Sequence, residues 1–176
     1  MSSKSKVVGT RYESKIRDTM NDWVGGGDNN SVCERVALRG SRDHGDLKIV
    51  VDDITLVGEC KYSKTYPSEG ELEDFKIQTV KENKHAGFDG GVLFVNLPRR
   101  STFRDEVWMP IGTLLLLHGI DIAAIDDASP EKRKRIESLL TSVDEHSWVR
   151  LTLLDFLWTC YGAPSWGWKG SASEKV

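Results

Sequence analysis

The sequence predicts an α/β domain with a mixed central β-sheet flanked by helices and with extra helices near the C-terminus. Two observations support this class. Segments with helical periodicity alternate with short runs of strand-forming residues. The length of 176 residues also suffices to bury the core of one domain. We expect this domain over residues 1–162, with the helices of 130–162 as a candidate dimerisation extension and 163–176 as a flexible tail.

The first half of the chain alternates between helix and strand. Residues 32–39 and the apolar run at 90–96 have the composition and length of strands. A helix is predicted over 10–23 from apolar residues at the spacing of one helical face: Tyr12, Ile16, Met20 and Trp23. A second helix is predicted over 71–84 from a broad apolar inner face: Leu72, Phe75, Ile77 and Val80.

The second half continues the same alternation. Short strands are predicted at 106–110 and 120–125. A charged helix is expected over 130–144, where a serine and a proline provide a start signal. Ser147 is a candidate cap for a further helix over 147–161, which is apolar on nearly every side. Such a helix is either an ordinary core helix or part of an interface with a second subunit.

Composition favours a globular protein of a reducing compartment. Hydrophobic residues make up 39% of the chain and charged residues 29%, which is typical of soluble domains. No apolar run reaches the ~18–20 residues of a membrane span, and the N-terminal "MSSKSK" lacks the apolar core of a signal peptide. Cys33, Cys60 and Cys160 contain no CxxC pair, which argues against a disulfide framework or a structural zinc site. We therefore expect a cytoplasmic location and no membrane partner.

The stretch "GDLKIVVDDITLVGECKY" at 45–62 reads as a hairpin with charged residues at unexpected places. If residues 52 and 53 form the turn, the numbers of opposed residues sum to 105, so Asp46 lies opposite Glu59. Opposed side chains have Cβ atoms ~4.5–5.5 Å apart, and like charges placed there repel each other. A positive partner is therefore expected beside this pair.

A divalent metal is one such partner. Mg²⁺ is bound through one or two carboxylates and keeps several waters for a substrate phosphate. Lys61 lies two residues after Glu59 on the same face of the strand, where it can orient water or stabilise charge on a phosphate oxygen. These parts suit phosphodiester hydrolysis. The alternative is an edge hairpin whose charged residues, Asp46, Glu59 and Lys61, simply face solvent.

The pattern "GD", a strand and turn, and then "ECK" resembles the PD-(D/E)XK nuclease superfamily. The stretches "RGSRDHGDLKI" and "VGECKYSK" resemble its phage and archaeal-type Holliday junction resolvases, and "GVLFV" and "VWMPIGTLLLL" resemble the later part of the phage subgroup. The likeness covers about residues 8–118. It implies a restriction-endonuclease-like core and, if the chain is phage-encoded, a location in the host cytoplasm.

The resemblance assigns roles to five residues. It implies that Asp46 and Glu59 bind Mg²⁺, with Mn²⁺ as a substitute, and that the backbone carbonyl of Cys60 adds a ligand. Lys61 is then the catalytic lysine. Glu13, on the preceding helix, completes the acidic cluster.

Glu13 has a second interpretation. Thr10 and Glu13 have the spacing of a capping box, in which the glutamate accepts from the Thr10 backbone amide at the start of the helix. Helical geometry also places Glu13 at the border of the apolar face. Both interpretations stay open at the level of the sequence.

Three further residues are candidate neighbours of the site. Ser41 and Asp43 precede Asp46 in a glycine-bounded loop, where an aspartate is also a common turn residue. Gln78 resembles a glutamine that many superfamily members place beside the active site. The chain departs from the fuller pattern, since it has Glu82 in place of a tyrosine and "GD" without the preceding proline. The first departure makes a RecB-type exonuclease less favoured.

The resemblance implies a Mg²⁺-dependent endonuclease that resolves four-way DNA junctions as a homodimer, because symmetric cutting requires two sites. The alternatives are a nicking, restriction-like or DNA-end nuclease and a non-catalytic protein that binds DNA structures. Basic residues near the N-terminus and after residue 96 are expected to bind backbone phosphates. These predicted DNA-binding residues are Lys4, Lys6, Arg11, Arg99, Arg100 and Arg104.

Overall fold

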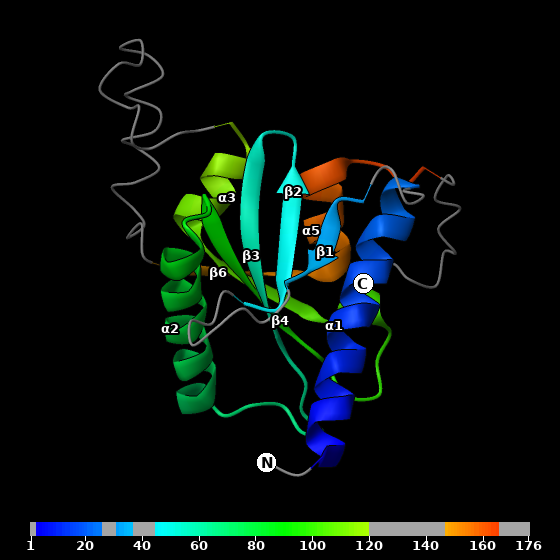
Figure 1. The fold of residues 1–176 in the computed structure, drawn as a ribbon, viewed down its shortest axis with the longest axis vertical. Coiled ribbons are helices and arrows are strands. Elements are labelled where there is room, and N and C mark those ends of the chain that lie inside the picture. The colour runs from blue at the N-terminus through cyan, green and yellow to red at the C-terminus, as the bar shows by residue number, and fades with distance from the viewer. Residues whose placement is uncertain (1–2, 26–30, 37–44, 120–146, 166–176) are drawn as a thin grey trace.

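A six-stranded mixed sheet forms the centre of the protein (Figure 1). The computed structural model describes residues 3–25, 31–36, 45–119 and 147–165, with side chains from residue 8 onwards. The order of strands across the sheet is the order in the chain. The strands are β1 (Cys33–Arg35), β2 (Leu47–Val51), β3 (Ile54–Lys61), β4 (Gly90–Val95), β5 (Glu106–Pro110) and β6 (Trp148–Thr152). Neighbouring strands are antiparallel except β3 and β4, which are parallel, so the predicted α/β class with a mixed sheet is confirmed.

Helices cover both faces of this sheet. Helix α2 fills the crossover between β3 and β4, as a parallel pair requires. The short helices η1 and α3 flank β5. The described helices are α1 (Ser3–Val24), α2 (Glu69–Ala86), η1 (Thr102–Arg104), α3 (Ile111–Leu117) and α5 (Leu153–Tyr161).

The larger core lies under α1 and α5, which lie close together in Figure 1. Helix α1 begins earlier than the predicted residue 10, but the predicted apolar face is the buried one. From the sheet, alternate residues such as Ile49 on β2 and Phe94 on β4 point into this core. Phe94 packs edge-on against Phe156 of α5, with ring centroids 5.8 Å apart. The residues that α1 buries here are Tyr12, Ile16, Met20 and Trp23.

Helix α2 covers the opposite face, and its inner side differs from the prediction. Ile77 and Val80 are 60% and 50% exposed, so the prediction that they belong to the inner face is wrong. The buried positions are Leu72, Thr79 and Glu82. A Cβ added at Gly91 of β4 would lie 3.1 Å from the Thr79 methyl, so helix and strand approach closely here. Polar residues face the sheet because α2 also contacts the charged end of β3.

The hairpin of β2 and β3 has the predicted register. Val51 pairs with Ile54 and Leu47 with Gly58, so opposed numbers sum to 105. The two-residue turn contains Asp52 with φ of 53°, a left-handed conformation that Asp tolerates better than most residues. Regular pairing ends at Leu47. The next residue, Asp46, donates its backbone N–H to the Gly58 carbonyl at 3.0 Å.

The C-terminal region corrects the prediction of a single helix over 147–161. Residues 148–152 form β6, which pairs with β5 at the edge of the sheet, and the helix starts only at Leu153. The sequence "WVRLT" contains Trp, Val and Thr, which favour a pleated and half-buried strand. Thr152 and Asp155 form a capping box, so this pair rather than Ser147 marks the start of α5. The apolar side of α5 packs into the core of its own chain.

Some predicted elements lie outside the described residues. These are the strand at 120–125, the helix at 130–144 and most of the tail at 163–176. The predicted strand at 32–39 is observed as β1, and its residues beyond 36 are not described. Within the described ranges, no helix has the length and apolar character to cross a membrane.

Candidate active site

The C-terminal end of β3 carries a charged group under α2. Glu59 and Lys61 lie on the same face of the strand, and Glu59 is only 4% exposed. The Lys61 ammonium donates to Glu59 Oε1 and, at 2.9 Å, to Gln78 Oε1 on α2. Gln78 Nε2 in turn donates to Glu59 Oε1 at 3.1 Å. The three side chains thus form a closed hydrogen-bonded triangle between strand and helix.

Asp46 joins this group from the end of β2. Its Oδ2 accepts the backbone N–H of Cys60 at 2.8 Å. The preceding Gly45 has φ of 81° and packs closely on Val57 of β3, where a side chain would collide. A glycine is therefore required for the chain to enter β2 at this point. The turn fixes the carboxylate of Asp46 against the residue between Glu59 and Lys61.

The electrostatics show that Asp46 and Glu59 crowd each other. Burial and then the negative charge of Glu59 raise the pKa of Asp46 from 3.8 to about 7. Burial and a hydrogen bond with Glu82 raise the pKa of Glu59 from 4.5 to about 8, although Lys61 lowers it. Two acids with pKa values this high repel each other when both are ionised. An additional positive charge at the pair would relieve this repulsion.

Glu82 is a member of the site that the sequence did not predict. It is 2% exposed and accepts from Gln78 Nε2 at 2.6 Å through Oε1. Its carboxyl group also raises the pKa of Glu59, which favours the protonated form of that acid. The spacing of four residues between Gln78 and Glu82 places both on one side of a helix. That spacing was the available signal, but the apolar Ile77 and Val80 suggested a different inner face.

Glu13 lies near the site and is not a cap. Helix α1 begins at Ser3, so Glu13 lies well inside it and the capping-box interpretation is wrong. Its Oε2 accepts from the Arg35 guanidinium of β1 at 2.6 Å. The negative charge of Glu13 also raises the pKa of Asp46. Glu13 thus contributes to the acidic character of the site while Arg35 holds its side chain.

The carboxylate oxygens of the site are chemically suited to a hard divalent cation. Mg²⁺ prefers carboxylate oxygens and needs only one or two of them, and Asp46 and Glu59 supply two. Within the residues that the structure describes, no group of three or more His, Cys, Asp or Glu side chains is arranged to hold a metal ion. Glu59 Oε1 instead contacts Lys61 and Gln78.

Of the other predicted site residues, Ser41 and Asp43 lie outside the described ranges.

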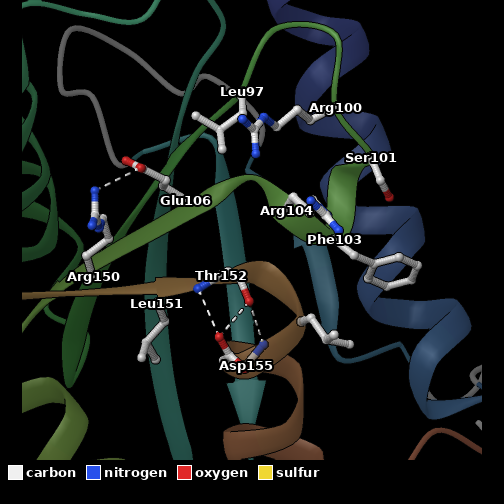
Figure 2. Close-up of a pocket in the computed structure, with 11 residues that line it drawn as sticks. Leu97, Arg100, Ser101, Phe103, Arg104, Glu106, Arg150, Leu151, Thr152 and Asp155 are labelled. Atoms are coloured by element: carbon white, nitrogen blue, oxygen red, sulfur yellow. Dashed lines mark hydrogen bonds and ion pairs between the residues drawn. The ribbon is translucent and has the colours of Figure 1, made fainter. Parts of the chain in front are cut away.

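The predicted DNA-binding residues separate into two cavities, one on each side of the segment 96–105. Arg11 and Arg99 line a cavity of about 640 Å³ beside α1. Arg104 lines a different cavity of about 610 Å³ beside β6 (Figure 2). Arg100 borders both. Lys4 and Lys6 lie in the first turns of α1, where side chains are not described.

Figure 2 shows that three charged residues of the second cavity, Glu106, Arg150 and Asp155, have partners within it. Arg150 forms an ion pair with Glu106 at 3.2 Å, and Asp155 is engaged by Thr152 at the start of α5. Arg104 of η1 is exposed at the border of this cavity. Two acids and three bases thus line this cavity, whereas the cavity beside α1 has one acid among five bases.

No protein-family model, curated protein or solved structure matches the chain. The function is therefore inferred from the residues of the chain itself.

Proposed function

We propose that the protein is a Mg²⁺-dependent endonuclease that hydrolyses phosphodiester bonds in branched DNA, with four-way junctions as the leading substrate. The observation that carries this proposal is the close pair of acids, the half-buried Asp46 and the buried Glu59, with Lys61 in contact with Glu59. The restriction-endonuclease-like core belongs to the same proposal. A mixed sheet with a crossover helix and acids on an antiparallel hairpin is compatible with it.

The residues of the site have different roles in this proposed reaction. Asp46 and Glu59 would hold the cation, which when bound supplies Lewis acidity and positive charge at the phosphate. Lys61 carries a positive charge beside them and can stabilise charge that develops on a phosphate oxygen. Gln78 fixes the Lys61 ammonium through Oε1 and Glu59 through Nε2. Lys61 must release Glu59 in part when a cation binds, and Gln78 then keeps it in place.

The decisive experiment offers labelled four-way, flap, single-stranded and linear duplex DNA to the purified protein with Mg²⁺ or Mn²⁺. Paired symmetric cuts in the four-way substrate are the expected result. Equal cutting of linear duplex would contradict the proposed junction preference but still support the proposed nuclease activity. Absence of cutting in every substrate, with either metal, would remove the nuclease as well.

A non-catalytic DNA-binding protein is the second candidate, and one contact favours it. The Lys61 ammonium already contacts Glu59, so the acids can be stable without a metal. The two candidates differ in their response to Mg²⁺. A nuclease gains thermal stability from Mg²⁺ and loses that gain in Asp46→Asn, whereas a protein with a purely structural ion pair shows no metal-dependent shift.

A further inference from the structure

A basic groove lies between α1 and the segment 96–105, next to the end of β3. Its volume of about 640 Å³ is in the range of pockets that take a small ligand, roughly 300–1,000 Å³. A DNA duplex cannot enter a cavity of this size, but a few linked nucleotides can. The groove is also lined by Tyr62, which directly follows Lys61. The groove therefore borders the end of β3 that carries the candidate active site, on the side of α1.

Positive charge dominates the walls of the groove. Two of its basic residues come from one side of α1, one follows β3, and two come from the turn after β4. All five are exposed, and none forms an ion pair with any described residue. The one acid in the lining, Asp105, is 3% exposed and accepts the Leu97 N–H at 2.7 Å. The basic residues are Arg11, Lys15, Lys64, Arg99 and Arg100.

An exposed aromatic ring lies among these charges. Tyr62 is 46% exposed, and its ring is tilted against the buried Tyr12 with centroids 6.0 Å apart. The Asn96 side chain accepts the N–H of Ser63 at 2.6 Å and fixes the chain just beyond Tyr62. A held aromatic ring beside cations is the combination that binds single-stranded nucleic acid, through base stacking and phosphate contacts.

The backbone conformation at Arg99 also supports binding in the groove. Arg100 N–H donates to the Leu97 carbonyl at 3.3 Å, which closes a turn with Arg99 as its third residue. Arg99 has φ of 63°, and glycine is the residue that favours this conformation in turns. An arginine is retained where the turn alone would prefer glycine. Such strain is typical of residues that are kept for binding.

We propose that this groove binds an unpaired DNA strand, with its phosphates on the five cations and one base stacked on Tyr62. The groove then directs a single-stranded part of a branched substrate toward Lys61. This last step rests on the proposed nuclease function, but binding in the groove does not.

Binding is tested with a short fluorescent oligothymidine and with a matched duplex, by anisotropy in EDTA. Tyr62→Ala should weaken binding of the single strand about 5- to 150-fold, the loss of one base stack, and leave duplex binding nearly unchanged. Tyr62→Phe should retain binding. Tyr66→Ala is the matched control, because Tyr66 is 45% exposed but contacts Glu106 instead of the groove.

Arg99→Gly provides a second test that keeps the fold. Glycine suits the turn, so the thermal midpoint should not fall, while binding of the single strand weakens. The proposal is overturned if wild type binds the single strand no better than Tyr62→Ala does. It is also overturned if Tyr62→Ala and Arg99→Gly weaken duplex binding as much as they weaken single-strand binding. Cleavage with Mg²⁺ is measured separately, so a protein that binds in the groove but cuts no DNA would refute only the proposed nuclease.

Discussion

The acidic site and the basic groove lie on either side of the end of β3, and they hold their charges in opposite ways. Asp46, Glu59 and Glu82 are largely withdrawn from solvent and tied to named donors. The groove cations are exposed and have no ion-pair partner among the described residues. Buried charges depend on their partners, whereas exposed charges act independently and are screened by salt. The two regions should therefore respond differently to mutation, pH and salt.

The largest difference is expected from Glu59→Gln. The variant keeps the shape of the side chain but removes a candidate metal ligand, so we expect cleavage of four-way DNA to fall more than ~100-fold. Binding of the same DNA in EDTA should be retained or become tighter, because the variant cannot carry a negative charge at this position. Single-turnover cleavage and anisotropy measure the two effects. Glu73→Gln on the outer side of α2, where the side chain is 62% exposed, is the control and should change neither.

The pH dependence of folding stability should separate the regions next. The pKa values of Asp46 and Glu59 are raised in the folded protein to about 7 and about 8. The unfolded chain loses these protons at lower pH, so the contribution of these two groups to stability is greatest near pH 4 and falls as pH rises toward 8. Each group contributes at most about 1.4 kcal/mol per pH unit in its window.

Urea denaturation in EDTA between pH 4.5 and pH 8 measures this slope. Glu59→Gln should reduce the fall in stability. Lys64→Ala in the groove should leave it unchanged, because Lys64 does not contribute to the raised pKa values of Asp46 or Glu59. An equal slope in Glu59→Gln and wild type would show that Glu59 is not held in its protonated form.

A smaller effect is expected from Glu82→Gln. The amide can still accept from Gln78, but it cannot hold a negative charge beside Glu59. Residues that support a metal ligand typically change activity by about 10- to 100-fold, and we expect cleavage near the lower end of that range. The pH profile should also shift, because the negative charge of Glu82 no longer raises the pKa of Glu59. An unchanged rate and an unchanged profile would assign Glu82 a role in packing only.

The smallest effect concerns salt. Lys15→Ala should reduce the slope of log affinity against log salt by about 0.7 for a single strand, the value for one phosphate contact. Glu59→Gln should leave this slope unchanged, because Glu59 is buried beside Lys61. Titrations of oligothymidine binding at several NaCl concentrations measure both. A changed slope in Glu59→Gln would show that the two regions are not electrostatically separate.

The local parts of the site were predictable and the long-range parts were not. The hairpin register follows from a two-residue turn, which placed Asp46 near Glu59 from spacing alone. Glu82 was missed because helical apolarity at Ile77 and Val80 gave the wrong inner face. Strand β6 was missed because its residues also fit the apolar pattern of the following helix. The segment becomes a strand through pairing with β5, a contact across the chain that no local pattern contains.

The groove was predicted only in part for the same reason. Basic residues near the N-terminus and after residue 96 were expected to bind DNA, and Arg11, Arg99 and Arg100 do come together. Tyr62 and Lys64 lie in a third segment, which only the fold brings beside them. Arg104 is close in sequence to Arg100 but borders only the second cavity, because it lies in η1, where the chain changes direction.

The single parallel pair of strands has a consequence for the order of assembly. Strands β2 and β3 are neighbours in the chain and can pair through their short turn, whereas β4 reaches β3 only after α2 has crossed the sheet. Asp46 therefore meets Cys60 early, and Gln78 completes the triangle only once the crossover docks. We expect amide hydrogens of the hairpin to exchange more slowly than those of α2. Local opening of α2 would then break the contacts of Gln78 with Glu59 and Lys61 while the sheet stays intact.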